Sequence, residues 1–294
     1  MKRIALKIDV DTYPGARMGA PALAELLQRH DAQATFFFSL GPDQSGRDSS
    51  AESLKLGLGL PSRLYGRVLP APSIGIRCRS ILKSIAATSF ETGLRAWNRV
   101  RWEQQILNAD NRLAETEMDR AYRRFQEIFE TVPTAIATPG WRASRHVLRL
   151  EQRMGFHYAS DCRGHRPFLP VVDGELIACV QIPTTLPTLD ELLSLEPDLS
   201  PDQAMDRLLQ LSRAIPGDHV FTLRAEVEGM KFFASFERLL TQWRAEGYSL
   251  VALRQIYETL DPRRLKTHSV RRSAIPGRKG LRLVQGDTFP SHKR

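Results

Sequence analysis

The sequence contains little cysteine, and that scarcity narrows the class of protein. Its three cysteines, Cys78, Cys162 and Cys179, are odd in number and lie far apart along the 294 residues. They predict neither a disulfide framework nor a cysteine-rich metal cluster. We therefore expect the protein to work in a reducing compartment, the cytoplasm.

Long hydrophobic runs and targeting signals are also missing. No apolar stretch reaches the roughly 18 residues that a membrane-spanning helix needs. Met1-Lys2-Arg3 leads directly into a strand-like segment, which predicts that there is no signal peptide. No helix-turn-helix, zinc-finger or RNA-binding signature is found, so we do not expect nucleic acid as a partner.

The composition is that of an ordinary globular protein with more basic than acidic residues. Hydrophobic residues make up 42% of the chain and charged residues 26%, as in soluble globular proteins. Lysine and arginine number 42 against 33 acidic residues, for a formal charge of +9. This excess predicts an anionic partner such as a phosphate group or an anionic membrane face.

Strand-like and helix-like segments alternate along most of the chain. A buried strand at 4–11 precedes leucines at helical spacing in 21–30 and an aromatic strand at 34–39, which is the signal for a parallel sheet. Later come a helix at 117–130, a helix capped by Ser200, a strand at 219–223, a helix at 236–243 and a strand at 248–253. The alternation predicts one α/β domain over residues 1–258.

Two segments break this alternation. Residues 44–71 carry leucines at alternate positions from Leu54 to Leu60, with glycines between them, which predicts a long loop insertion. Their mixture of leucine and arginine would also suit contact with an anionic lipid surface. Residues 259–294 are strongly basic and punctuated by proline and glycine, and they predict a C-terminal tail.

Two aspartates stand at the end of the first predicted strand. Asp9 and Asp11 point to the same side because they are two residues apart in a strand. They lie at the carboxyl end, where α/β folds place their sites, and such a pair suits a metal ligand beside a general base. A solvated strand end with a capping aspartate would look the same, so these two residues alone leave both interpretations open.

Further motifs carry a resemblance that covers essentially the whole chain. Asp9-Val-Asp-Thr12 and Ala34-Thr-Phe-Phe-Phe38 are similar to the opening of NodB-type polysaccharide deacetylases. Within that superfamily the chain resembles the 4-deoxy-4-formamido-L-arabinose-phosphoundecaprenol deformylases of lipid A modification. The segments that carry this closer resemblance are Ser39-Leu-Gly-Pro-Asp43, Gly93-Leu-Arg-Ala-Trp97, Pro139-Gly-Trp-Arg-Ala143, Ser160-Asp-Cys-Arg-Gly164, Gln181-Ile-Pro-Thr-Thr-Leu-Pro187, Ala225-Glu-Val-Glu-Gly229 and Ala274-Ile-Pro-Gly-Arg278.

The resemblance implies a distorted (β/α) barrel and a metal-dependent hydrolase. Asp9 would be the general base, and Asp11 would bind a divalent metal, zinc or similar, with two histidines of a His-Ala-Trp-Asp-His segment. A histidine of a late strand would protonate the leaving amine. The substrate would be a formamido sugar on undecaprenyl phosphate, so the protein would be cytoplasmic or peripheral at the inner membrane face.

The chain departs from this pattern at the positions of the metal ligands and of the proton donor. Where the two ligand histidines should stand, it has Arg95 and Arg99, and Arg224 replaces the late-strand histidine. Arginine offers a metal no lone pair and stays protonated near neutral pH, so it replaces neither a ligand nor a proton donor. Asp9 and Asp11 alone are too few ligands for a zinc-like site. His165 could reach the mouth of the site, although a surface or packing role is the favoured interpretation.

The favoured hypothesis is a non-hydrolytic homologue without a metal cofactor. Arg95, Arg99 and Arg224 would point into the pocket of the two aspartates and leave surplus positive charge for a phosphate or carboxylate. The ligand would be a lipid-linked sugar phosphate or another anion. The residues expected to bind it are Trp141, Arg142, Asp161 and Arg163.

Three other interpretations stay open. The chain could be an active amide hydrolase of the same pathway with an unrecognised metal site, because its other motifs are retained. It could be a surface adaptor that binds anionic lipid or a partner enzyme through the basic tail and the 44–71 loop. The arginines could also be neutral drift after activity was lost.

Overall fold

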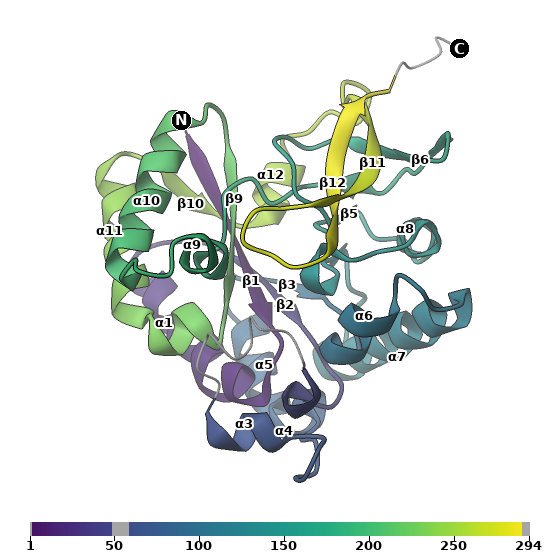
Figure 1. Cartoon of the computed structure of the whole chain (residues 1–294), viewed down its shortest axis with the longest axis horizontal. Coiled ribbons are helices and arrows are strands. Elements are labelled where there is room, and N and C mark those ends of the chain that lie inside the picture. Colours follow the sequence, from purple (N-terminus) through teal and green to yellow (C-terminus); the bar gives the residue numbers. More distant parts are fainter. Residues whose placement is uncertain (1, 49–58, 290–294) are drawn as a thin grey trace.

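The first strand lies next to one end of a curled parallel sheet (Figure 1). The computed structural model describes residues 2–48 and 59–289. Strand β9 runs along one edge of β1, and β10 and then β2 along the other, followed by β3, β4, β5 and β8. The bounds are β1 (Arg3–Val10), β2 (Thr35–Phe38), β3 (Glu91–Leu94), β4 (Ala135–Ile136), β5 (Tyr158–Ala159), β8 (Val180–Gln181), β9 (His219–Arg224) and β10 (Ser249–Val251).

Hydrogen bonds bridge the gap between the two ends of this sheet. The Thr184 and Thr222 hydroxyls lie 2.7 Å apart, and the Thr185 amide donates to the Val220 carbonyl at 3.1 Å. The segment after β8 therefore reaches β9, and the sheet curls into the distorted barrel that the family resemblance implies.

The alternation of side chains along β1 separates the core from the site. Ile4, Leu6 and Ile8 face outward into the main hydrophobic core beneath the helices. The residues between them face the interior of the barrel, where Ala5 packs in a second apolar cluster. Lys7 and Asp9 continue that inward row, so β1 carries charge into the barrel toward its carboxyl end.

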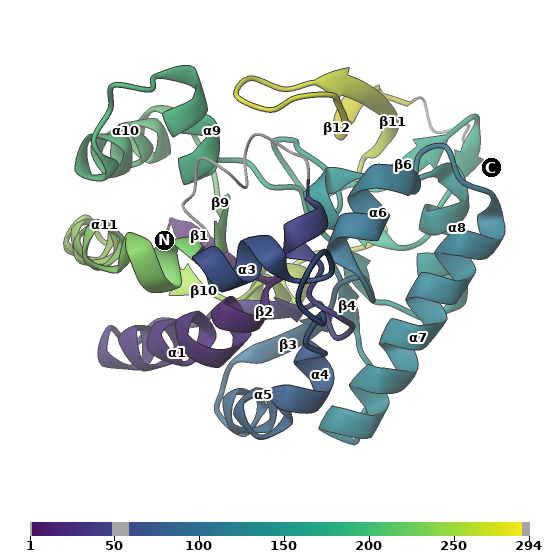
Figure 2. The same cartoon turned by 60° about the horizontal axis from the view of Figure 1, so that its bottom comes forward.

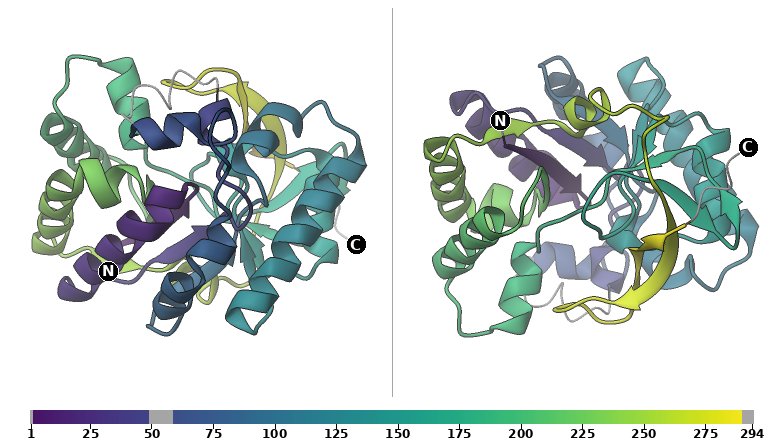
Figure 3. Two further views of the ribbon diagram at one scale, coloured as in Figure 1. Left: turned by 90° about the horizontal axis from the view of Figure 1, so that it is seen from below. Right: turned by 90° about the horizontal axis from the view of Figure 1, so that it is seen from above.

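Helices cover most of the outer face of the sheet (Figure 3). On α7 the residues Met118, Ala121 and Phe125 are buried, as their spacing predicts, and Ser200 caps α10 through a capping box. No helix in the described residues is both long and apolar enough to cross a bilayer. The longer helices are α1 (Ala20–Arg29), α5 (Arg79–Ala86), α7 (Asn111–Phe129), α8 (Arg145–Arg153), α10 (Pro201–Ala214) and α11 (Phe233–Ala245).

Shorter helical segments connect these elements and shape the rim of the barrel. They are η1 (Gly15–Gly19), η2 (Ser45–Arg47), α3 (Leu60–Leu64), α4 (Ile74–Arg77), α6 (Arg99–Gln105), η3 (Pro139–Trp141), α9 (Leu189–Leu195), η4 (Val227–Lys231) and α12 (Leu253–Tyr257). Two of them, η2 and α3, fall in the segment expected to be a loop, so its described part contains helical turns. The leucines at 54, 56 and 58 lie outside the described residues.

The C-terminal segment differs from the tail that its composition indicated. Strands β11 (Thr267–Ala274) and β12 (Leu281–Thr288) form an antiparallel hairpin. With β6 (Leu169–Val172) and β7 (Glu175–Leu176) they make a second sheet in the order β12-β11-β6-β7. His268, Leu283 and Gln285 are buried in it, whereas Arg271 and Arg272 are exposed. Arg271 and Arg272 thus stand on the outer side of a folded strand, whereas Arg282 of β12 is buried.

Candidate functional site

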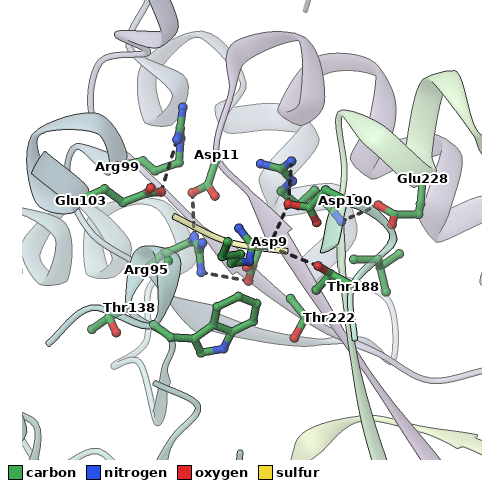
Figure 4. Close-up of a pocket in the computed structure, with 15 residues that line it drawn as sticks. Asp9, Asp11, Arg95, Arg99, Glu103, Thr138, Thr188, Asp190, Thr222 and Glu228 are labelled. Atoms are coloured by element: carbon green, nitrogen blue, oxygen red, sulfur yellow. Dashed lines mark hydrogen bonds and ion pairs between the residues drawn. The ribbon is translucent and has the colours of Figure 1, made fainter. Parts of the chain in front are cut away.

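A small cavity opens at the carboxyl ends of β1, β3 and β9 (Figure 4). Its free volume is about 30 Å³, room for roughly one or two water molecules. The surrounding side chains therefore nearly fill it. They come from Asp9, Asp11, Arg95, Arg99, Glu103, Thr138, Gly140, Trp141, Thr188, Asp190, Thr222, Leu223, Arg224, Glu228 and Arg278.

The guanidinium of Arg95 lies between the two aspartates of β1. Its Nη1 is 2.9 Å from Asp9 Oδ1 and its Nε is 2.6 Å from Asp11 Oδ1, and Nη1 also donates to the Ala137 carbonyl at 3.2 Å. The Ser39 hydroxyl donates to the same Asp11 oxygen at 2.7 Å. Only 3% of the Arg95 side chain is exposed, so one buried cation bridges both carboxylates.

Burial and charge act in opposite directions on this cluster. Burial raises the pKa of Asp9 despite the nearby charges of Arg95 and Lys7. Burial would also raise the pKa of Asp11, but Arg95, Arg99 and the Ser39 hydrogen bond together hold it below its usual range. Beneath them burial lowers the pKa of Lys7 to about 8, while its ammonium donates to the Ser160 carbonyl at 2.6 Å.

Arg99 lies on one wall of the cavity, at the start of α6. Its guanidinium is 2.8 Å from Asp48 and 3.2 Å from Glu103, and it is almost fully buried. Asn98 immediately precedes the helix, and its side chain accepts a hydrogen bond from the Arg101 amide at 2.9 Å. Asparagine caps a helix about as well as aspartate, so replacing the acid of the family motif preserves this helix start.

The opposite wall joins β9, α9 and the tip of the C-terminal hairpin. Arg224 Nη2 lies 3.6 Å from Asp190 Oδ2, and the Arg224 amide donates to Glu228 at 2.8 Å. Arg278, from the hairpin tip, reaches Asp190 at 2.9 Å and Glu191 at 2.8 Å. Burial raises the pKa of Glu228 to about 8, so this carboxyl is mostly neutral at neutral pH.

Trp141 forms the floor between the two walls. Gly140 and Trp141 have positive φ values of 63° and 51°, an uncommon backbone for tryptophan that forms the tight turn carrying the indole. Cations lie over its ring at 4.7 Å (Arg278), 5.3 Å (Arg163) and 5.7 Å (Lys7). Of the four residues expected to bind substrate, Trp141 is the one that lines the cavity.

The other three lie behind the wall. Arg142 donates a side-chain hydrogen bond to the Glu103 carbonyl. Asp161 accepts from the Thr138 amide at 2.5 Å. Arg163 donates to the Leu186 carbonyl at 2.6 Å. These contacts position the turns that form the cavity, and their role toward a ligand stays a prediction.

The expected surplus of positive charge is wrong for this cavity. Of the described residues on its wall, four are arginine and five carry carboxyl groups. The sequence interpretation missed Glu103, Asp190, Glu228 and Arg278. Glu228 lies in a motif that it quoted and Arg278 ends another, so for these two residues the place in the family pattern was the available signal.

Metal-ligating groups are not gathered here. Among residues 2–48 and 59–289, no three His, Cys, Asp or Glu side chains are placed to hold an ion. His165 lies elsewhere, beside His268 and facing a different cavity with His219. The donor set at Asp9 and Asp11 does not fit a divalent metal, because a guanidinium already makes ion pairs with both carboxylates.

Comparison with known proteins identifies the family of this chain. Residues 2–159 match the family described as polysaccharide deacetylase. A probable 4-deoxy-4-formamido-L-arabinose-phosphoundecaprenol deformylase of Shewanella sediminis is 33% identical over 88% of this chain and 87% of its own. A Wigglesworthia glossinidia brevipalpis protein of the same name is 30% identical over 90% of this chain and 96% of its own.

Solved structures agree with the fold. One from Mycobacterium smegmatis, provisionally described as a polysaccharide deacetylase, has a TM-score of 0.67 and is 17% identical. The match covers 93% of this chain and 96% of that one. Identity this low supports the architecture, a curled parallel sheet surrounded by helices.

Proposed function

The chain belongs to the polysaccharide deacetylase family, and from this premise we propose that it is a non-hydrolytic member that binds a lipid-linked sugar phosphate. It is a homologue of deformylases whose name specifies a formamido sugar on phosphoundecaprenol. The proposal keeps that ligand class and removes the hydrolytic step. The position of Arg95 carries it.

Arg95 takes the place between Asp9 and Asp11 that a bound cation would need. Its two ion pairs, at 2.9 and 2.6 Å, balance the carboxylates with a permanent charge, although Asp9 Oδ1 accepts no hydrogen bond in the described residues. A metal ion would have to displace a guanidinium that nearby acids hold protonated, and it would gain two carboxylates with no imidazole. The residues present thus favour a charge-balanced site without a metal.

The proton donor of the family reaction is also replaced. Arg224 stands at the end of β9, and its pKa is raised above an already high usual value by Asp190 and Glu226, although burial opposes the shift. A group that never releases its proton near pH 7 cannot hand one to a leaving amine. The replacement of both ligand histidines and of the acid by arginine supports binding without turnover.

Elemental analysis of the purified chain tests this proposal most directly. Zinc, cobalt and manganese are each offered in excess and then removed by gel filtration. We expect far less than one metal per chain in the wild type and no deformylation of the formamido-arabinose lipid. About one metal per chain, lost in Asp11→Ala, would overturn the proposal.

An active amide hydrolase remains the second candidate. The retained Asp9 and Asp11, both buried at the mouth of the barrel, favour it. It requires turnover that falls steeply in Asp9→Asn, because Asp9 would be the base. The matched control is Asp206→Asn, which removes a carboxylate from a half-exposed surface pair with Arg238. Equal turnover in both variants would exclude this candidate.

We also propose that the protein contacts an anionic membrane surface through α3 and the turn after it. Leu60 and Val68 are each 77% exposed, and Arg63 and Arg67 are exposed beside them. Apolar and cationic side chains together suit anionic lipid.

Vesicle flotation tests this contact. Binding to anionic vesicles should weaken with salt and should drop in the double variant L60S/V68S. The control is Leu176→Ser on β7, which removes another exposed leucine. Equal binding of wild type and double variant would refute the contact.

A further inference from the structure

Two arginines converge on one oxygen of Asp190. Arg278 Nη2 lies 2.9 Å and Arg224 Nη2 3.6 Å from Asp190 Oδ2, and all three side chains are mostly buried. Burial would raise the pKa of Asp190, but Arg278 and Arg224 hold it well below its usual range. The carboxylate is therefore the anion that balances this pair of guanidinium groups.

Arg224 still has unused hydrogen-bonding capacity at the cavity. Arg224 Nη2 is buried and makes no hydrogen bond in the described residues. Its 3.6 Å contact with Asp190 is longer than a hydrogen bond, so the donor is held in a charge contact only. Thr188 and Thr222 line the same space, and their hydroxyls already bond Arg278 and Thr184. Buried donors of this kind are usually satisfied by a partner or a ligand.

The hairpin tip that carries Arg278 is seated on α9 (Figure 2). Gly277 has φ +78°, and a Cβ there would stand 2.5 Å from the Glu191 carbonyl oxygen, so the tip approaches the helix as closely as backbone allows. Arg278 Nε bonds Glu191 at 2.8 Å, and its guanidinium stacks over Trp141 at 4.7 Å. One arginine thus fastens the tip over the cavity.

We propose that Arg224 and Arg278 form a binding site for a phosphate or carboxylate group, which Asp190 occupies in this structure and which a ligand enters by replacing Asp190. The inference rests on the proposed function, since it assigns the part of the site that would hold the phosphate of a sugar phosphate. The remaining 30 Å³ is too small for such a group beside Asp190. Ligand entry therefore moves the Asp190 carboxylate aside and loosens the hairpin tip.

Asp190→Asn tests the exchange directly. The amide keeps the size of the side chain but leaves two buried guanidinium groups without their anion. Calorimetric titration with inorganic phosphate should show binding about tenfold tighter than in wild type, the size expected for one charge-assisted hydrogen bond. The control, Asp206→Asn, changes the net charge equally at the surface pair with Arg238 and should leave phosphate affinity unchanged.

A second variant and a second measurement test whether the tighter phosphate binding of Asp190→Asn takes place at Arg278 and the hairpin tip. The double variant D190N/R278Q should lose the tightening. In the wild-type chain, saturating phosphate should speed amide hydrogen exchange at residues 275–280, the tip, while β12 stays protected. This second measurement does not depend on Asp190→Asn folding.

The outcomes separate this inference from the proposed function. If folded Asp190→Asn binds phosphate no tighter than Asp206→Asn, or if the wild-type tip does not respond to phosphate, the arginine site is wrong and the metal-free proposal stands. A stoichiometric catalytic metal would overturn the proposed function whatever the phosphate data. Titration with a sugar 1-phosphate identifies the source: tighter binding than inorganic phosphate assigns a sugar ligand, and equal binding assigns free phosphate.

Discussion

Replacing Arg95 by glutamine should lower the free energy of unfolding, because it removes the cation that pairs with Asp9 and Asp11. The guanidinium makes ion pairs with Asp9 and Asp11 and is 3% exposed. Glutamine retains hydrogen-bonding capacity but no charge. Asp9 at the end of β1 and Asp11 just after it then lose the cation that pairs with both of them, and the charges of Lys7 and Arg99 act on one aspartate each.

Removing one partner of a buried ion pair costs about 3–5 kcal/mol of unfolding free energy. The cost depends on pH with a sign that follows from the carboxylates. In the wild type the pKa of Asp11 is depressed, so its stabilisation is present at neutral pH and is lost as pH falls through the folded value. In the variant both carboxyls take up protons more readily, so the deficit should be widest near about pH 8 and smaller near about pH 5.

Urea denaturation at these two pH values, followed by tryptophan fluorescence, measures the difference. Arg123→Gln is the control, because Arg123 and Asp119 form an exposed pair whose loss should cost less than about 1 kcal/mol. Adding Asp9→Asn and Asp11→Asn to Arg95→Gln should recover part of the loss. A deficit below about 1 kcal/mol that does not change with pH would refute the role of Arg95 as the buried counter-ion.

Further predictions follow from other positions in the same region. Glu228→Gln should raise the free energy of unfolding by roughly 1–3 kcal/mol near about pH 9 and leave it unchanged near about pH 4. The reason is that Glu228 has a folded pKa of about 8, so the wild type loses stability as pH rises above the usual value of 4.5. Urea midpoints that shift equally at both pH values would contradict this. Ser144→Ala should cost about 1 kcal/mol, since Ser144 caps α8 by accepting from the Val147 amide, and an unchanged midpoint would argue against the cap. Rebuilding the family ligands should create tight zinc binding of about one ion per chain, measured by elemental analysis, which further substitution of Asp11 should abolish. That rebuilt variant carries R95H, N98D, R99H and R224H.

The order of elements and the family could be predicted from local sequence. Strand and helix periods predicted the parallel sheet, and the structure confirms it from β1 to β10. The motifs around Asp9 and Trp141 identified the family, which the comparisons confirm. The replacement of ligand histidines by Arg95 and Arg99 could be read in the same way, because each motif lies within a few consecutive residues.

The hairpin was missed because the composition of the segment indicates a tail. Arg271 and Arg272 gave the segment the charge of a tail, but its two strands bury His268 and Leu283. The hairpin is stabilised by pairing with β6, about a hundred residues earlier. Nothing in the local sequence of β11 indicates that it pairs with a strand so far away in the chain.

The sequence by itself determined the fold class, the inward row that ends in Asp9 and Asp11, and the chemistry that arginine cannot perform. Only the tertiary structure decided which charges meet. Arg95 reaches Asp11 across 84 positions, and Arg278 reaches Glu191 across 87. Because a charge is buried only with a partner within a few ångströms, this pairing depends on chain folding. Because acidic side chains from distant parts of the chain pair with these arginines, the pocket that we expected to be positive has balanced charges.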